Sequence, residues 1–123
     1  MTAEDWQRIE GAIIAVVALV LTFMVNAGLG WWVWIVVLLA PDLSMLGYLL
    51  GARTGAAVYN LFHLYAGGLL LLLIGMVLGA TALMTFGLLW LVHVGADRAL
   101  GFGLKQPTGF ADTHLGKLHS GAD

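Results

Sequence analysis

The chain has 123 residues, of which 61% are hydrophobic and only 10% are charged, a balance typical of a membrane protein and not of a soluble domain. It contains no cysteine, which excludes disulfides, thiolate metal sites, iron–sulfur clusters and cysteine nucleophiles, so a metal site must use His, Asp or Glu. The formal net charge of -2 offers no basic patch, so we expect a lipid bilayer and no nucleic acid as partner.

Four apolar segments follow one another along the chain, and each is close to the length of about 20 residues that a helix needs to cross a bilayer. They run over 6–25, 31–50, 55–78 and 81–104. Glu4 and Asp5 precede the first one, unlike the basic start of a signal peptide, so we expect this segment to be retained as a span. Short glycine-bearing turns force neighbouring helices to run antiparallel. The sequence therefore predicts an all-α fold with a single domain, 1–123, built as a compact antiparallel bundle of four transmembrane helices.

The basic residues predict how this bundle lies in the membrane. They occur at the N-terminal end, in the second turn and toward the C-terminal end, at Arg8, Arg53, Arg98, Lys105 and Lys117. The antiparallel topology brings these three places to one side, and basic residues gather on the cytoplasmic side of a membrane. We therefore expect both termini to be cytoplasmic, with the polar tail 105–123 on the cytoplasmic surface.

A few ionisable residues lie inside the apolar segments. Counted along the helices at about 1.5 Å per residue, Asp42, His63 and His93 fall in the same layer on three different segments. Asp97 follows His93 by four residues, so both side chains can face one partner. An ionisable group in the hydrocarbon costs on the order of 3 kcal/mol and normally faces the interior of the bundle. Two His and two Asp supply the donors of a divalent-metal site, with zinc as the first choice.

Pro41 directly precedes the buried carboxylate of Asp42. Because proline has no N–H to donate to the carbonyl of Val37, it predicts a kink and a free carbonyl that must face protein, water or a ligand. Ser44 can relieve part of this deficit or form a hydrogen bond to Asp42. The alternative is that Pro41 only shapes the bundle and that the buried polar residues satisfy one another.

Further polar residues surround this layer. Tyr59 and Asn60 precede His63 by four and three residues, so they share its face of the helix and can orient the candidate ligands. His114 in the tail can fold toward Asp97 or remain solvated.

Three stretches carry a resemblance to a known family. They are PDLSMLGYLLG at 41–51, YNLFH at 59–63 and LVHVGADRALGFGLKQPTGFADTHLG at 91–116. They resemble the domain of unknown function 4260 family of small bacterial integral membrane proteins, which implies a location in the bacterial inner membrane but no established activity. The motif positions of the family are occupied by Asp42, Ser44, Asn60, His63, His93, Asp97, Arg98, Lys105, Thr113 and His114. The LVHVGAD and NLFH stretches are also similar to bacterial membrane-bound metal-dependent hydrolases.

The first functional hypothesis is a membrane-embedded metal-dependent hydrolase that acts on an amphiphilic or phosphorylated substrate at the cytoplasmic leaflet. The metal and its activated water would be held by the four candidate catalytic residues Asp42, His63, His93 and Asp97. The anionic substrate would be bound by Arg98 and Lys105, with contributions from Asn60, Ser44 and His114.

Two alternatives belong to other classes of protein. In one, the chain is a non-enzymatic carrier or accessory subunit whose buried Asp and His residues relay protons or recognise a solute. Such a thin bundle would form a homodimer through the small residues Gly67, Gly68, Gly75 and Gly79. In the other, which we favour least, His63 and His93 are the axial ligands of a haem.

Overall fold

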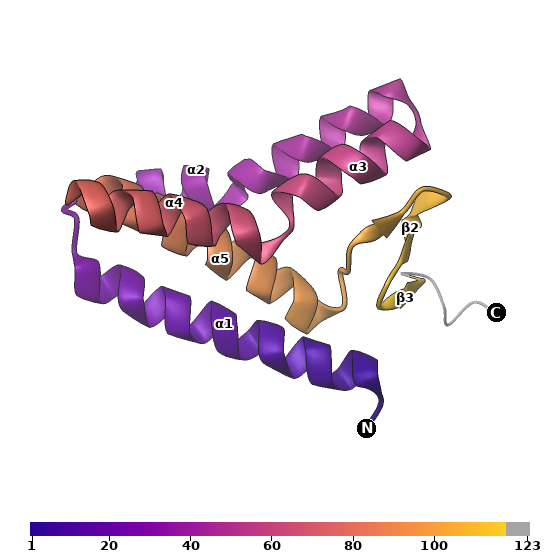
Figure 1. Ribbon diagram of the computed structural model, residues 1–123, viewed down its shortest axis with the longest axis horizontal. Helices are drawn as coiled ribbons and strands as arrows, with labels where there is room; N and C mark the ends of the chain where they lie inside the picture. The colour runs from indigo at the N-terminus through magenta and orange to yellow at the C-terminus, as the bar shows by residue number, and fades with distance from the viewer. Residues whose placement is uncertain (118–123) are drawn as a thin grey trace.

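The computed structural model describes residues 1–117, and the end of the predicted tail, 118–123, lies outside these residues. The elements are α1 (Ala3–Val25), α2 (Trp31–Leu39), the 3₁₀-helix η1 (Ala40–Leu50), α3 (Ala52–Phe62), α4 (Tyr65–Leu78), α5 (Thr81–Leu100), β1 (Lys105–Gln106), β2 (Gly109–Thr113) and β3 (Gly116–Lys117) (Figure 1).

Four helical runs are long and apolar enough to cross a membrane, namely Ala3–Val25, Trp31–Leu50, Ala52–Leu78 and Thr81–Leu100. The predicted all-α membrane fold is therefore confirmed. The fourth run ends earlier than the predicted residue 104, because Gly101 adopts a left-handed conformation with φ 91° and its N–H bonds back to the last turn of α5.

Helix α5 is the centre of the bundle, and α1, α2 and α4 all pack against it. Glycines allow the closest approaches: Gly95 of α5 lies against the backbone of α1 near Gly11, and Gly87 of α5 lies against α4 near Gly68. A side chain at any of these positions would collide with the facing backbone. Gly68 and Gly75, two of the residues considered for a dimer contact, face α5 of the same chain.

The second span changes its helical type at Pro41. The Ala40 N–H donates to the Val37 carbonyl in the tighter i to i+3 pattern, so the carbonyl expected to be free is satisfied, and that expectation was wrong. The Ser44 hydroxyl donates to the Pro41 carbonyl at 2.7 Å, and thus stays within η1. The 3₁₀ geometry of Ala40–Leu50 is the form that the predicted kink takes.

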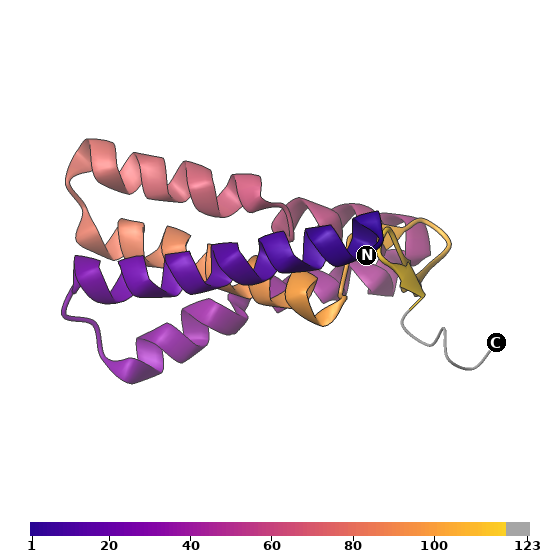
Figure 2. The ribbon, with the colours of Figure 1, turned by 90° about the horizontal axis from the view of Figure 1, so that it is seen from below.

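The third span is also broken, at a place without proline. His63 leaves the helical region with φ -114° and ψ 17°, and Leu64 is extended with φ -85° and ψ 152° before α4 begins. Because both middle spans break at this level, η1 and α3 leave the bundle together as a helical hairpin that turns at Gly51, where φ is 111° (Figures 1 and 2).

The C-terminal strands pack beneath this hairpin. They form an antiparallel sheet of order β1-β2-β3, and β1 and β2 pack against α3. The Asn60 side chain pairs with the backbone of Lys105 as a neighbouring strand would. Its amide NH₂ donates to the Lys105 carbonyl at 2.8 Å, and its amide oxygen accepts from the Lys105 N–H at 2.6 Å. The predicted polar tail is therefore an ordered sheet tied to α3 over residues 105–117.

Candidate metal centre

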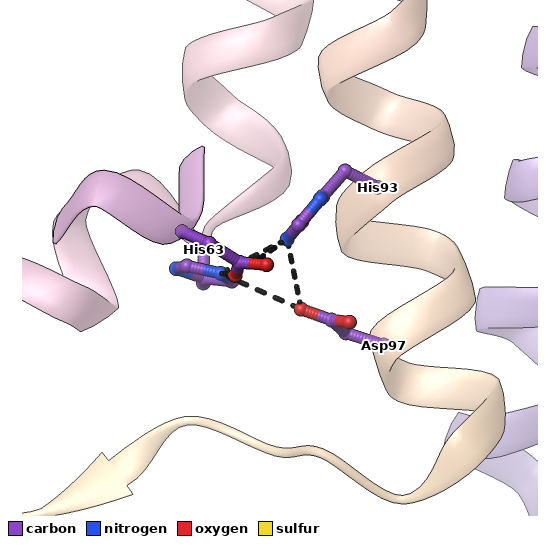
Figure 3. A group of neighbouring side chains, drawn as sticks. His63, His93 and Asp97 are labelled. Atoms are coloured by element: carbon purple, nitrogen blue, oxygen red, sulfur yellow. Dashed lines mark hydrogen bonds and ion pairs between the residues drawn. The ribbon is translucent and has the colours of Figure 1, made fainter. Parts of the chain in front are cut away.

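The two helix breaks bring the four predicted ligands to one place. Asp42 lies in the first turn of η1, and His63 occupies the break between α3 and α4. His93 and Asp97 lie in the last two turns of α5, and Figure 3 shows their side chains directed toward that of His63. Residues from three spans thus converge, as the sequence predicted.

Five of the six distances between the donor atoms are close to those of a tetrahedral site, and all four atoms lie within 4.8 Å of one another. His93 Nε2 lies 3.0 Å from Asp42 Oδ1 and 3.1 Å from Asp97 Oδ2. His63 Nε2 lies 3.3 and 3.4 Å from the same two oxygens and 3.3 Å from His93 Nε2. Ligands bound to zinc at about 2.0–2.1 Å in a tetrahedron lie about 3.3–3.4 Å from one another. The cluster therefore has room for one small ion at its centre.

Both histidines are held in the tautomer that a metal requires. His63 Nδ1 lies 2.8 Å from the Tyr59 carbonyl, and His93 Nδ1 lies 2.6 Å from the Leu38 carbonyl. Because a carbonyl can only accept, each Nδ1 carries a hydrogen and a neutral ring presents the lone pair of Nε2 to the cluster. Two lone pairs and two carboxylates then face one another, and only a positive charge makes this arrangement favourable.

Pro41 explains why the Leu38 carbonyl is available to His93. In the i to i+3 pattern that Ala40 begins, the residue that would donate to Leu38 is Pro41, which has no N–H. The proline thus directs a backbone acceptor to a candidate ligand 55 residues away along the chain. The sequence analysis did not predict the hydrogen bond between His93 and the Leu38 carbonyl, although the proline three residues after Leu38 is a signal for a free carbonyl there.

The histidine side of the cluster is closed and the carboxylate side is open. The side chains of His63 and His93 are 3% and 7% exposed, whereas those of Asp97 and Asp42 are 20% and 45% exposed. The Tyr59 ring stacks on His63 with centroids 3.7 Å apart and an interplanar angle of 7°, which fixes the imidazole plane. A small molecule can therefore approach the cluster beside Asp42.

Arg98 contacts the backbone of His63 and no donor atom of the cluster. Its Nη2 donates to the His63 carbonyl at 2.8 Å, and its guanidinium lies over the Tyr65 ring at 5.4 Å from the centroid. The helix break leaves that carbonyl without a helical partner, and the buried guanidinium supplies one. The structure thus places Arg98 against the backbone of a candidate ligand.

The other predicted substrate residues lie outside the four-donor cluster. The Lys105 ammonium is buried over the rings of Phe110, at 3.8 Å, and Tyr59, at 4.9 Å, and has no hydrogen-bond partner within 1–117. Burial lowers the pKa of Lys105, and the negative charge of Asp97 offsets part of this shift. His114 Nδ1 accepts from the Leu104 N–H at 2.8 Å and so belongs to the tail. Phe110, which the sequence analysis did not single out, covers Lys105 from β2.

The donor set suits a divalent cation, since two carboxylates would balance its charge and two neutral imidazoles would complete a shell of four ligands. No curated protein and no solved structure matches the chain. The family model described as "Domain of unknown function" matches residues 4–118, which includes the first span that the sequence motifs did not reach. The chain therefore belongs to the domain of unknown function 4260 (DUF4260) family.

Proposed function

We propose that Asp42, His63, His93 and Asp97 bind one divalent metal ion, zinc in the first place, and that the protein is a membrane-embedded metal-dependent hydrolase. The observation that carries the proposal is the set of donor distances of 3.0–3.4 Å around two histidines that present Nε2 lone pairs. A dication would neutralise both carboxylates inside the membrane, which removes the high cost of burying unpaired charges there.

A haem does not suit the same two histidines. The axial nitrogens of a haem stand on opposite faces of the macrocycle, about 4 Å apart if each bond is about 2 Å. Here the two Nε2 atoms are 3.3 Å apart, and a carboxylate oxygen lies within 3.4 Å of each of them. This spacing favours a single small ion.

Hydrolysis requires a place for water at the metal, and Asp42 is the ligand beside which it would enter. A bound divalent ion lowers the pKa of a coordinated water to about 7. Asp42 Oδ1 is on the open side of the cluster, where it can yield its place to water and accept the proton that the water loses. His63, His93 and Asp97 would then remain as the three protein ligands of a catalytic site.

The position of the cluster favours an amphiphilic substrate. Asp97 lies one turn before the end of α5, so the site would sit within the membrane but close to one head-group layer. The basic residues at this end of the bundle favour the cytoplasmic leaflet of a bacterial inner membrane, with both termini in the cytoplasm. An ester or phosphoester between the chain and the head group of a lipid-like molecule is found at this depth.

Elemental analysis of protein purified without a histidine tag tests the metal. We expect about one equivalent of zinc in the wild type and loss of the metal in His93→Ala, because His93 is one of the three ligands that would remain when Asp42 yields its place to water. His114→Ala is the matched control, since this histidine lies outside the cluster and should leave the metal content unchanged. Asp42→Asn should retain zinc more strongly than His93→Ala and lose hydrolysis of amphiphilic phosphate and carboxylate esters.

The same preparation distinguishes the hydrolase from the carrier alternative. A wild-type protein that binds no metal after zinc, manganese or iron has been offered would contradict the metal centre. Proton-coupled flux in metal-free liposomes that disappears in Asp42→Asn would then support a proton or solute site built from the same residues.

A further inference from the structure

A groove with a volume of about 280 Å³ lies over α5 between α2 and α4, which are on either side of α5 in Figure 2. Ala40 and Pro41 form one wall, Leu71 of α4 forms the other, and Phe86 and Trp90 of α5 form the floor. All of these side chains are apolar apart from the indole N–H. The volume is just below the range of about 300–1,000 Å³ for ligand pockets.

A hydrogen bond between α5 and the end of α3 holds the aromatic lining of the groove in place. The indole N–H of Trp90 donates to the Phe62 carbonyl at 2.8 Å, and the two rings lie nearly parallel with centroids 6.0 Å apart and an angle of 19°. This carbonyl lies at the end of α3, where the helix break removes its helical partner. The contact that repairs the break therefore also holds the aromatic lining of the groove in place.

The groove reaches residues that are the chain neighbours of two candidate ligands. Pro41 directly precedes Asp42, and Phe62 directly precedes His63. Trp90 lies three residues before His93, on a neighbouring part of the same helix face. A molecule that fills the groove as far as Pro41 and Phe62 would therefore end at the residues that precede Asp42 and His63, and Asp42 is the most exposed of the four ligands.

We propose that this groove holds the hydrocarbon chain of an amphiphile whose anionic head group lies at the Asp42, His63, His93 and Asp97 centre. The inference rests on the proposed function and names the substrate class of that site. The groove is formed by membrane-spanning helices, so the phase around it is lipid hydrocarbon and its apolar lining matches a chain of methylenes. A metal at the centre would offer an oxygen of the anionic head group the coordination position beside Asp42, on the open side of the cluster.

The groove acts by orientation and not by hydrophobic attraction. A chain gains almost no transfer free energy when it moves from a lipid bilayer into an apolar groove, because the two surroundings are equally apolar. A head group bound at the centre fixes where the chain begins, and the groove then fixes its direction. This alignment holds the bond to be cleaved at one position beside Asp42.

Photocrosslinking of the zinc-loaded protein in phosphatidylcholine nanodiscs tests the groove. The probe is dodecyl phosphate with a diazirine at the end of the chain, and mass spectrometry locates the adducts. We expect adducts concentrated on the groove-lining parts of α2, α4 and α5, displaced by excess dodecyl phosphate but not by dodecyl maltoside, which lacks the anionic head. Ala40→Phe fills the groove and should abolish this enrichment.

The matched control is Ala66→Phe, which adds the same ring to an exposed position of α4 outside the groove lining. This variant should keep the wild-type adducts. Adducts spread evenly over the exposed faces of all four spans, or an enrichment that survives Ala40→Phe, would overturn the inference and identify ordinary surrounding lipid.

Metal content measured on the same samples separates the two proposals. Bound zinc together with evenly spread adducts refutes the groove and leaves the metal centre standing. Groove adducts that dodecyl phosphate displaces in a protein without metal support the groove and refute the metal centre.

Discussion

Replacement of Pro41 by alanine tests the link between the helix break and the candidate metal centre. Alanine restores an N–H three residues after Leu38, and this N–H would compete with His93 Nδ1 for the Leu38 carbonyl. The present contact measures 2.6 Å and holds the imidazole with its lone pair toward the cluster. Pro41→Ala should therefore weaken zinc binding without removing a ligand.

The magnitude follows from the role of this contact. Loss of a hydrogen-bond partner that orients a metal-bound histidine costs about 10–100-fold in metal affinity. On the affinity scale this corresponds to about 1.4–2.8 kcal/mol. Complete loss of metal would instead indicate that more than His93 had moved, since His63 is held separately by the carbonyl and the ring of Tyr59.

Competition with a chromogenic chelator measures this affinity in detergent. The control is Pro107→Ala, which removes the other proline of the chain from the turn between β1 and β2, outside the four-ligand cluster. Wild-type affinity in Pro41→Ala would refute the argument that the proline supplies an acceptor to His93. An equal loss in both variants would refute it too, since a general weakening of the fold would explain the result.

Three other outcomes follow from the same contacts. If the protein binds metal, a chelator should lower its thermal unfolding temperature and zinc should restore it. The stabilisation should be about 2.7 kcal/mol at a free zinc concentration 100 times Kd. No shift of the unfolding temperature is expected in His93→Ala, and an equal shift there would contradict the ligand assignment. Burial first, and then the charge of Arg98, hold the pKa of His114 below its ordinary value of 6.5, so the undocked tail binds protons more readily and the docked tail loses stability as the pH falls below 6.5. The protection factors for amide hydrogen exchange over 109–117 should fall at acidic pH, and His114→Gln should remove this pH dependence; an unchanged profile in the variant would contradict it. Gly95→Val places a side chain against the Gly11 carbonyl and should cost about 1–3 kcal/mol of stability in denaturant titrations, whereas the exposed Ala66→Val should be nearly neutral.

The class of fold was readable from the sequence because it depends on local composition. Apolar segments of sufficient length partition into a bilayer whatever their neighbours do, so four spans followed from counting. The identity of the four candidate ligands was also readable, because an ionisable group at membrane depth is too costly to be kept without a partner. Asp42, His63, His93 and Asp97 met these conditions, and the structure brings them together.

The supports of the cluster were decided by the tertiary structure alone. No proline marks the helix break at His63 in the sequence. The carbonyl freed by this break accepts a hydrogen bond from Arg98, which lies 35 residues away along the chain. The tail carries short polar segments that read as a surface coil, yet Asn60 pairs with the backbone of Lys105 and orders them as a sheet. The sequence by itself determined the membrane location, the number of spans and the donor types, because each is a property of a residue and its immediate segment. Which carbonyl orients which histidine depended on contacts between distant residues, and these form only when the whole chain has packed.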